Sequence, residues 1–288
     1  MSAGTRAPSG LRLLARRIGQ DPMGVLGLTI VVAVVLVGLL APWITPFDPF
    51  KLNIPDKLQS PNVVHWMGTD QLGRDVFSRV ILGTRIALIV GITSVAIALV
   101  LGLALGLLAG YGPRWLDNIL VLIFDSFYSF PTVVLALLVA VLLGPSLNTL
   151  MLVIVVIQTP GYARLTRTAT LARKSSEYID AIRSLGASPL RIVGLHVLPN
   201  IVGPLFIIAS MDIPAVVALE AGLTLLGLGI PPPAPSWGRT IQEGFLLIRE
   251  APWIVFCGGL PLIITTLGFT FLGEALRDLL DPKLRRVV

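Results

Sequence analysis

The sequence predicts an all-α membrane protein that crosses the bilayer six times, with both ends in the cytoplasm. Hydrophobic residues make up 55% of its 288 residues and charged residues only 13%, whereas a soluble domain carries about 25% charged residues. Six apolar stretches reach the roughly 20 residues that a membrane-spanning helix needs. Lys and Arg are unevenly distributed between the connecting segments. This composition excludes an ordinary soluble enzyme and a disordered chain.

The apolar stretches are expected to be helices, because only helices and closed barrels satisfy their backbone hydrogen bonds in lipid. The first is too long for the apolar part of a signal peptide and is interpreted as an uncleaved span. The third and fourth share a charge-free stretch that Gly144-Pro145-Ser146 divides. Gly102 and Gly106 in the second span have a spacing typical of helix packing. The expected spans are residues 23–44, 86–112, 118–143, 147–163, 201–228 and 251–273.

The connecting segments predict the orientation. With the N-terminus inside, the cytoplasmic segments hold 15 Lys and Arg and the outside segments hold 7, and positive charge is typical of the cytoplasmic side. We expect a basic amphipathic tail (1–22) lying on membrane lipid, one six-span domain (23–276) and a cytoplasmic C-terminal tail (277–288). The domain includes an outside segment (45–85) and a cytoplasmic loop (164–200).

The cytoplasmic loop begins with the pattern of a short amphipathic helix. Tyr178, Ile182 and Leu185 recur at helical spacing, and the opposite face is polar. Gly186 is expected to end this helix, because the residue after a helix often needs a positive φ. The three apolar side chains are expected to form one face of the helix.

A second helix is expected to begin at Ser188-Pro189, with serine as the cap and proline in the first turn. It is expected to run to about Leu198, where Pro199 interrupts it. The loop could be a plain connector, a DNA-binding helix-turn-helix or a docking element for a cytoplasmic partner. Spans on both sides leave no room for a helix to enter a DNA groove.

The residues of this loop resemble a known motif. Asp180-Ala181-Ile182, Gly186 and His196-Val197-Leu198-Pro199 resemble the EAA loop of ABC importer permeases, Glu-Ala-Ala-x3-Gly-x9-Ile-x-Leu-Pro. Asp180, Ile182 and His196 depart from that pattern, while the spacing, the glycine and the Leu-Pro pair agree.

Further motifs resemble the C-type permease subunit of the peptide and nickel importer branch, and they follow in the same order along the chain. The resemblance covers about residues 20–286. The matching segments are residues 39–42, 47–49, 65–75, Asp125 with 130–131, Glu220 with 226–229, 235–238 and 276–282.

The resemblance implies the fold of a type I ABC importer permease in a prokaryotic inner membrane. Such a subunit forms half of a transmembrane pathway. Its implied partners are a homologous second permease, two cytoplasmic ATPase subunits and an extracytoplasmic substrate-binding protein. Segment 177–187 would be the coupling helix, seated on one ATPase. The implied coupling residues are Glu177, Tyr178, Asp180, Ala181, Ile182, Gly186, Leu198 and Pro199.

ATP and Mg are expected on the partner ATPases and no cofactor on this chain. A phosphate-binding Walker A loop needs a lysine after glycine, and none of the four lysines follows a glycine. His65 and His196 fall on opposite sides of the membrane and cannot share a metal site. The net charge of +6 reflects the cytoplasmic surplus and does not indicate nucleic-acid binding. We therefore expect that the chain is not an enzyme.

Three acidic residues lie at or within the expected spans. Ionisable groups in a bilayer are costly and usually face a cavity or a partner. Asp125, Asp212 and Glu220 are therefore candidates for the pathway or for the permease interface. Asp212 and Glu220 also allow an alternative, a proton-coupled secondary transporter that uses carboxylates as relays. The sequence leaves the substrate open between dipeptides, longer peptides, nickel complexes and other ligands.

Overall fold

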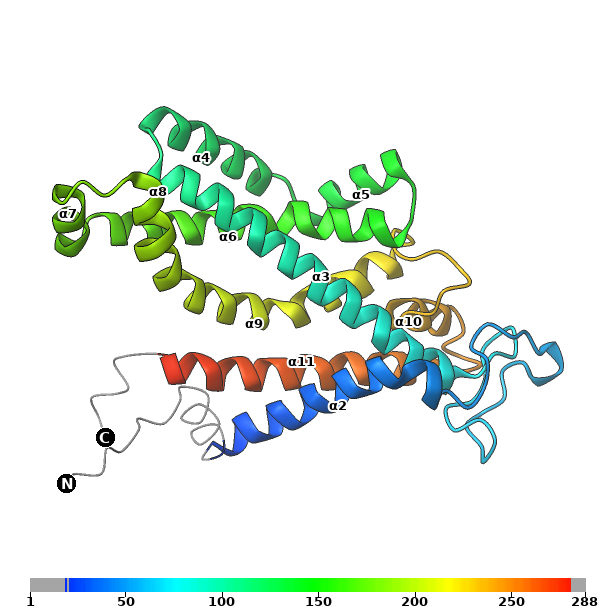
Figure 1. Cartoon of the computed structure of the whole chain (residues 1–288). Helices are drawn as coiled ribbons and strands as arrows, with labels where there is room; N and C mark the ends of the chain where they lie inside the picture. Colours follow the sequence, from blue (N-terminus) through cyan, green and yellow to red (C-terminus); the bar gives the residue numbers. More distant parts are fainter. Residues whose placement is uncertain (1–18, 20, 281–288) are drawn as a thin grey trace, which may run out of the picture.

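The computed structural model describes residue 19 and residues 21–280, and every regular element within them is helical (Figure 1). The expected amphipathic helix of the N-terminal tail and the end of the C-terminal tail lie outside the described residues. The main helices are α2 (Pro22–Ile44), α3 (Val76–Tyr111), α4 (Arg114–Ser129), α5 (Thr132–Leu143), α6 (Leu147–Lys174), α7 (Glu177–Ser184), α8 (Pro189–Ile192), α9 (Leu198–Leu225), α10 (Trp237–Leu246) and α11 (Pro252–Leu280).

Five helical stretches are long and apolar enough to cross a membrane, and α4 with α5 makes a sixth if the pair is counted as one span. The long helices run between two ends of the molecule (Figure 1). α7 and α8 lie at one end, called the α7 end here. α10 and the loops between α2 and α3 lie at the other, called the α10 end. α2 begins and α11 ends at the α7 end.

The third span is not one helix, as expected for residues 118–143, but two helices bent by 92°. α4 ends at Ser129 and α5 begins at Thr132, so the break falls on Phe130-Pro131. Proline lacks an N–H donor and disfavours helical geometry in the residue before it. The continuous apolar composition hides this break, because hydropathy does not register backbone geometry.

The second and fourth spans are parts of longer helices than the sequence predicts. α3 begins earlier because Asp75 caps it, and the Asp75 carboxylate accepts a hydrogen bond from the N–H of Ser78 at 2.7 Å. α6 continues to Lys174. The length of an apolar stretch indicates only the part of a helix that suits lipid. The helix itself continues beyond that part where its polar side chains find partners. α10 has no counterpart among the expected helices.

Pro199 does not interrupt the second loop helix. α8 continues into α9 through a π-helical turn, Val193–Val197, in which the N–H of Leu198 donates to the Val193 carbonyl five residues back. Pro199 then lies in the first turn of α9, where its missing N–H is tolerated. The wider π turn joins the two helices, so the loop and the fifth span form one helical stretch.

The predicted break between the third and fourth spans is confirmed. Gly144 has φ of +79°, which a residue with a side chain rarely adopts. Its N–H donates to the Ala140 carbonyl at 2.9 Å and closes the last turn of α5. The Ser146 hydroxyl then caps α6 by accepting from the N–H of Thr149 at 3.0 Å.

α3 and α6 pack closely along a glycine seam, formed by Gly102, Gly106 and Gly110. A Cβ atom built on Gly106 would lie 2.5 Å from the Ala163 carbonyl oxygen, and one built on Gly110 would lie 2.8 Å from the Thr170 Cβ. Helices in lipid associate through such close backbone approach. The prediction that Gly102 and Gly106 serve packing is confirmed.

We predict that Gly106→Leu destabilises the protein by about 1–3 kcal/mol, because the added side chain has no space in the seam. Gly259→Leu in α11 is the matched control, since none of the described atoms lies within 4 Å of a Cβ built there. The measurement is the thermal unfolding midpoint of both purified variants in lipid nanodiscs. Equal midpoints for the two variants contradict the seam.

Candidate functional site

The sequence-predicted coupling segment forms a helix, a glycine turn and a second helix at the α7 end. Gly186 has φ of +83° and donates its N–H to the Arg183 carbonyl at 2.9 Å. The N–H of Ala187 donates to the Ile182 carbonyl at 3.4 Å. These two bonds form a Schellman motif, which ends α7 and reverses the chain. Ser188 then caps α8 by accepting from the N–H of Arg191.

The face of α7 that contacts the protein differs from the expected one. Ile179 is fully buried, in the apolar core that also contains Ile192 and Val197. Tyr178 is 40% exposed and Leu185 is 87% exposed. Ile182, the third residue of the expected apolar face, is partly buried against the same core. The rest of that face is open, because Ile179 already anchors this short helix in the core.

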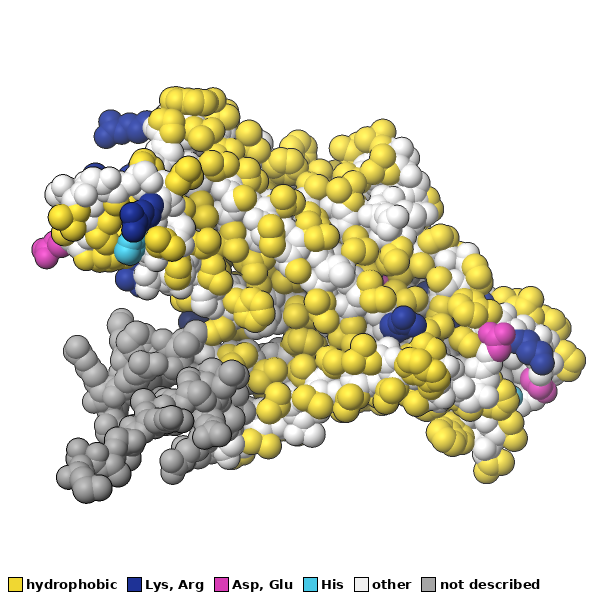
Figure 2. Space-filling view, viewed as in Figure 1, with side chains coloured by type: hydrophobic (Ala, Val, Ile, Leu, Met, Phe, Trp, Pro, Cys, Tyr) yellow, Lys and Arg dark blue, Asp and Glu magenta, His cyan; other side chains and the backbone are white. Residues whose placement is uncertain are grey.

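The other predicted coupling residues divide into two groups. Glu177, Asp180 and Ala181 are exposed on α7, and Asp180 pairs with Arg183 at 2.9 Å. Leu198 and Pro199 instead lie in the first turn of α9, at the base of the segment. In Figure 2 most charged side chains lie at the two ends of the molecule, and apolar side chains cover the part between them.

Two arginines of α6 hold α4 in place. Arg167 binds Asp117 through two hydrogen bonds, Nε to Oδ1 at 2.5 Å and Nη2 to Oδ2 at 2.7 Å. Arg164 binds Asp125 and lies over the ring of Tyr128, 4.5 Å from its centre. Asp125 is thus an exposed partner of a neighbouring helix in this conformation.

The two acids of α9 have different surroundings although they lie two turns apart. Asp212 is partly buried and accepts a hydrogen bond from the Tyr162 hydroxyl of α6 at 2.7 Å. Glu220 is fully buried and accepts from the Thr224 hydroxyl at 2.9 Å within its own helix. The start of α10 covers this part of α9, since a Cβ built on Gly238 would lie 2.6 Å from the Ala221 Cα. Glu220 therefore has no surface for a partner or a pathway in this conformation.

A buried ionic cluster at the α10 end is absent from the sequence-predicted site. Arg74 Nε lies 2.6 Å from Asp70 Oδ2, and Arg74 Nη2 lies 3.2 Å from Glu243 Oε2. Arg79 lies 3.5 Å from Asp70 and 3.6 Å from Glu243, and Arg239 binds Glu243 at 2.9 Å. The cluster joins the loops before α3 to α10. A sequence signal exists in retrospect, because Asp70 and Arg74 lie within segment 65–75, one of the segments that resemble C-type permeases.

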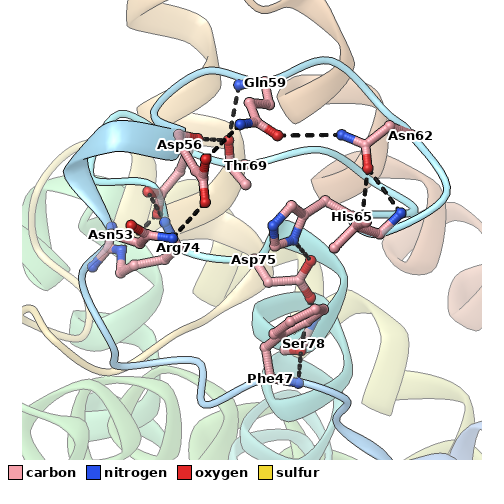
Figure 3. Close-up of polar contacts among 12 residues, drawn as sticks. Phe47, Asn53, Asp56, Gln59, Asn62, His65, Thr69, Arg74, Asp75 and Ser78 are labelled. Carbon is pink, nitrogen blue, oxygen red and sulfur yellow. Dashed lines mark hydrogen bonds and ion pairs between the residues drawn. The ribbon is translucent and has the colours of Figure 1, made fainter.

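The loops before α3 are held by a second set of polar contacts (Figure 3). His65 Nδ1 lies 2.8 Å from Asp75 Oδ1, and the other oxygen of Asp75 accepts from Ser78. The Thr69 hydroxyl accepts from the N–H of Gln59 at 2.8 Å. His65 thus has a structural partner on its own side of the molecule.

Comparison with known proteins identifies the family. The family described as binding-protein-dependent transport system inner membrane component matches residues 102–286. The chain belongs to this family. The N-terminal transmembrane domain of oligopeptide transport permease C matches residues 9–61, so this permease is of the C type. It is a multi-pass inner-membrane protein, and the resemblance seen in the sequence is confirmed.

Curated relatives of this permease match along almost the whole chain. It is 35% identical to the dipeptide transport system permease protein DppC of Alkalihalophilus pseudofirmus, over 97% of its own length and 92% of the relative. It is 35% identical to the di/tripeptide transport system permease protein DppC of Pseudomonas aeruginosa, over 96% and 94%. It is 36% identical to the glutathione transport system permease protein GsiD of Pectobacterium atrosepticum, over 94% and 90%.

A solved structure shares the fold of this permease. The inward-facing MetNI methionine ABC transporter superposes with a TM-score of 0.58 at 21% identity, over 72% of this chain and 97% of that chain. The likeness supports the type I importer permease fold. Neither this fold nor the family supports a proton-coupled secondary transporter.

We predict that Glu243→Gln destabilises this permease by about 3–5 kcal/mol, because it leaves buried arginines without their carboxylate. Glu250→Gln is the matched control, since Glu250 is exposed at the same end of the molecule. Thermal unfolding in nanodiscs measures both. A Glu243→Gln midpoint equal to that of the control contradicts a structural role for the cluster.

Proposed function

We propose that this permease forms half of the pathway of an ATP-driven importer for di- or oligopeptides, and that α7 couples it to an ATPase. The exposed apolar surface of α7 carries the proposal. Tyr178 and Leu185 are exposed on α7, and Leu190 of the following helix α8 is 87% exposed. A surface of this kind in a polar end of the molecule suits a groove on a partner protein.

The proposed orientation places the α7 end in the cytoplasm. α4 and α5 then count as one bent span, which gives six spans and puts both chain ends on the side of α7. The surplus of Lys and Arg in the segments at this end supports the assignment. The six-span domain then extends over about residues 23–276, with loop 164–200 facing the ATPase.

The proposed partners are a homologous second permease, two ATPase subunits that bind ATP and Mg, and an extracytoplasmic substrate-binding protein. The name of the family supports the last of these, because its members belong to binding-protein-dependent systems. The chain itself has no glycine-lysine pair with which to cradle phosphates. ATP hydrolysis is therefore assigned to the partners.

We propose that α7 transmits motion to two spans at once. It follows α6 after a two-residue link and precedes the continuous stretch of α8 and α9. The bond between Tyr162 of α6 and Asp212 of α9 joins these spans deeper in the molecule. An ATPase that binds α7 differently in its two states shifts both spans between two arrangements of the pathway.

The substrate class is proposed from the relatives, whose names specify dipeptides, di/tripeptides and glutathione. All are short peptides or peptide-like molecules, which favours such substrates over nickel complexes. Asp212 is the acid that we assign to the pathway or the permease interface, because it lies partly exposed in the middle of α9. The choice among peptides is assigned to the binding protein.

We predict that Gly186→Pro abolishes import, because proline fixes φ near −65° and removes the N–H that binds Arg183. Gly186→Asn is the matched control, since asparagine tolerates a positive φ. Uptake of a labelled dipeptide is measured in cells with equal amounts of each variant in the membrane. Import by Gly186→Pro equal to that of Gly186→Asn means that the turn is not needed for coupling.

We predict that Leu185→Asp lowers the amount of ATPase that co-purifies with the permease by about tenfold or more, because a buried leucine contributes about 1.5–3 kcal/mol. Gentle affinity purification followed by mass spectrometry measures the ATPase, the second permease and the tagged chain. The control is Leu246→Asp, at a site that is 79% exposed at the α10 end. Equal ATPase recovery with both variants overturns the docking assignment.

A further inference from the structure

An apolar turn projects from the loops between α2 and α3 at the α10 end. Val63 is 94% exposed, Val64 is 57% exposed and Trp66 is 64% exposed. Residues 58–69, which include this turn, contain no Lys, Arg, Asp or Glu. In Figure 1 the loops extend beyond the end of α2 at the α10 end. Neither the coupling segment nor the polar contacts described above require these exposed side chains.

Hydrogen bonds close the turn, and its apolar side chains are exposed. Asn62 Oδ1 accepts hydrogen bonds from the N–H groups of Val64 and His65, both at 2.8 Å (Figure 3). The His65 carbonyl accepts from the N–H of Asn62 at 2.9 Å. The His65 ring points inward to Asp75. Trp66 packs edge-on against Phe77 of α3, with ring centres 5.0 Å apart.

The turn lies beside the membrane-crossing part of α11. Its next residue, Met67, lines a shallow apolar groove together with Phe256 and Leu260. These two side chains of α11 are 73% and 53% exposed, within a helix long and apolar enough to cross a membrane. The exposed face of the turn therefore continues the lipid-facing surface of α11.

We propose that Val63, Val64 and Trp66 insert into the leaflet at the α10 end and anchor these loops to membrane lipid. Tryptophan favours the interface between lipid and water, where its ring is buried and its N–H remains hydrated. Trp43, at the end of α2, is 78% exposed at the same end of the molecule. The absence of charge in the turn removes the main cost of entering the headgroup region. A protein partner at this end is the competing occupant.

The test measures the membrane depth of Val63 in the assembled importer. A nitroxide is attached to Val63→Cys in a Cys257→Ala background, and the complex is reconstituted in phosphatidylcholine and phosphatidylglycerol vesicles. Collisions of the label with oxygen, which concentrates in lipid, are compared with collisions with a water-soluble nickel chelate. Lys57→Cys is the matched control, because Lys57 is exposed and charged in the same loops.

We predict a ratio of oxygen to nickel-chelate collisions several-fold higher at position 63 than at position 57. Equal ratios at the two positions place the turn in water and overturn the proposal. A label at 63 that is open to the nickel chelate until the binding protein is added assigns the turn to that protein and also overturns it. The readout needs no transport, so equal ratios overturn the anchoring of the turn without bearing on the proposed import of peptides.

Discussion

The close packing of α3 on α6 through the glycine seam is the constraint on which the other elements depend. The absence of side chains at Gly102, Gly106 and Gly110 lets the two backbones approach each other over two turns. In lipid such contact must supply the attraction that the hydrophobic effect supplies in water. α6 in turn carries α7 at its end and binds α4 through Arg164 and Arg167. The seam thus positions α7 and α4, which both attach to α6.

Polar contacts fasten the helix ends that the seam does not reach. At the α7 end, Lys174 donates to the carbonyls of Gly110 and Tyr111, so the last turns of α6 and α3 stay together. At the α10 end, the cluster around Arg74, Arg79 and Glu243 ties the loops before α3 to α10. The middle of the molecule relies mainly on apolar packing, as a lipid environment requires.

α7 is held much more lightly than the helices it connects. Ile179 is its one fully buried side chain, while the link to α9 runs through a π-helical turn. An element with so few internal contacts can change position at low cost when a partner binds it. The same features that leave Tyr178 and Leu185 exposed therefore suit the coupling role proposed for them.

The sequence by itself determined the features that local rules control. Apolar length located the spans, glycine and serine marked the break at 144–146, and the turn at Gly186 followed from its backbone preference. The resemblance to C-type permeases rested on such local motifs. Only the tertiary structure decided that Ile179 is buried while Leu185 is exposed, and that Arg74 reaches Glu243 far along the chain. Such choices depend on which helices pack together, and no local pattern encodes contacts between segments distant in sequence.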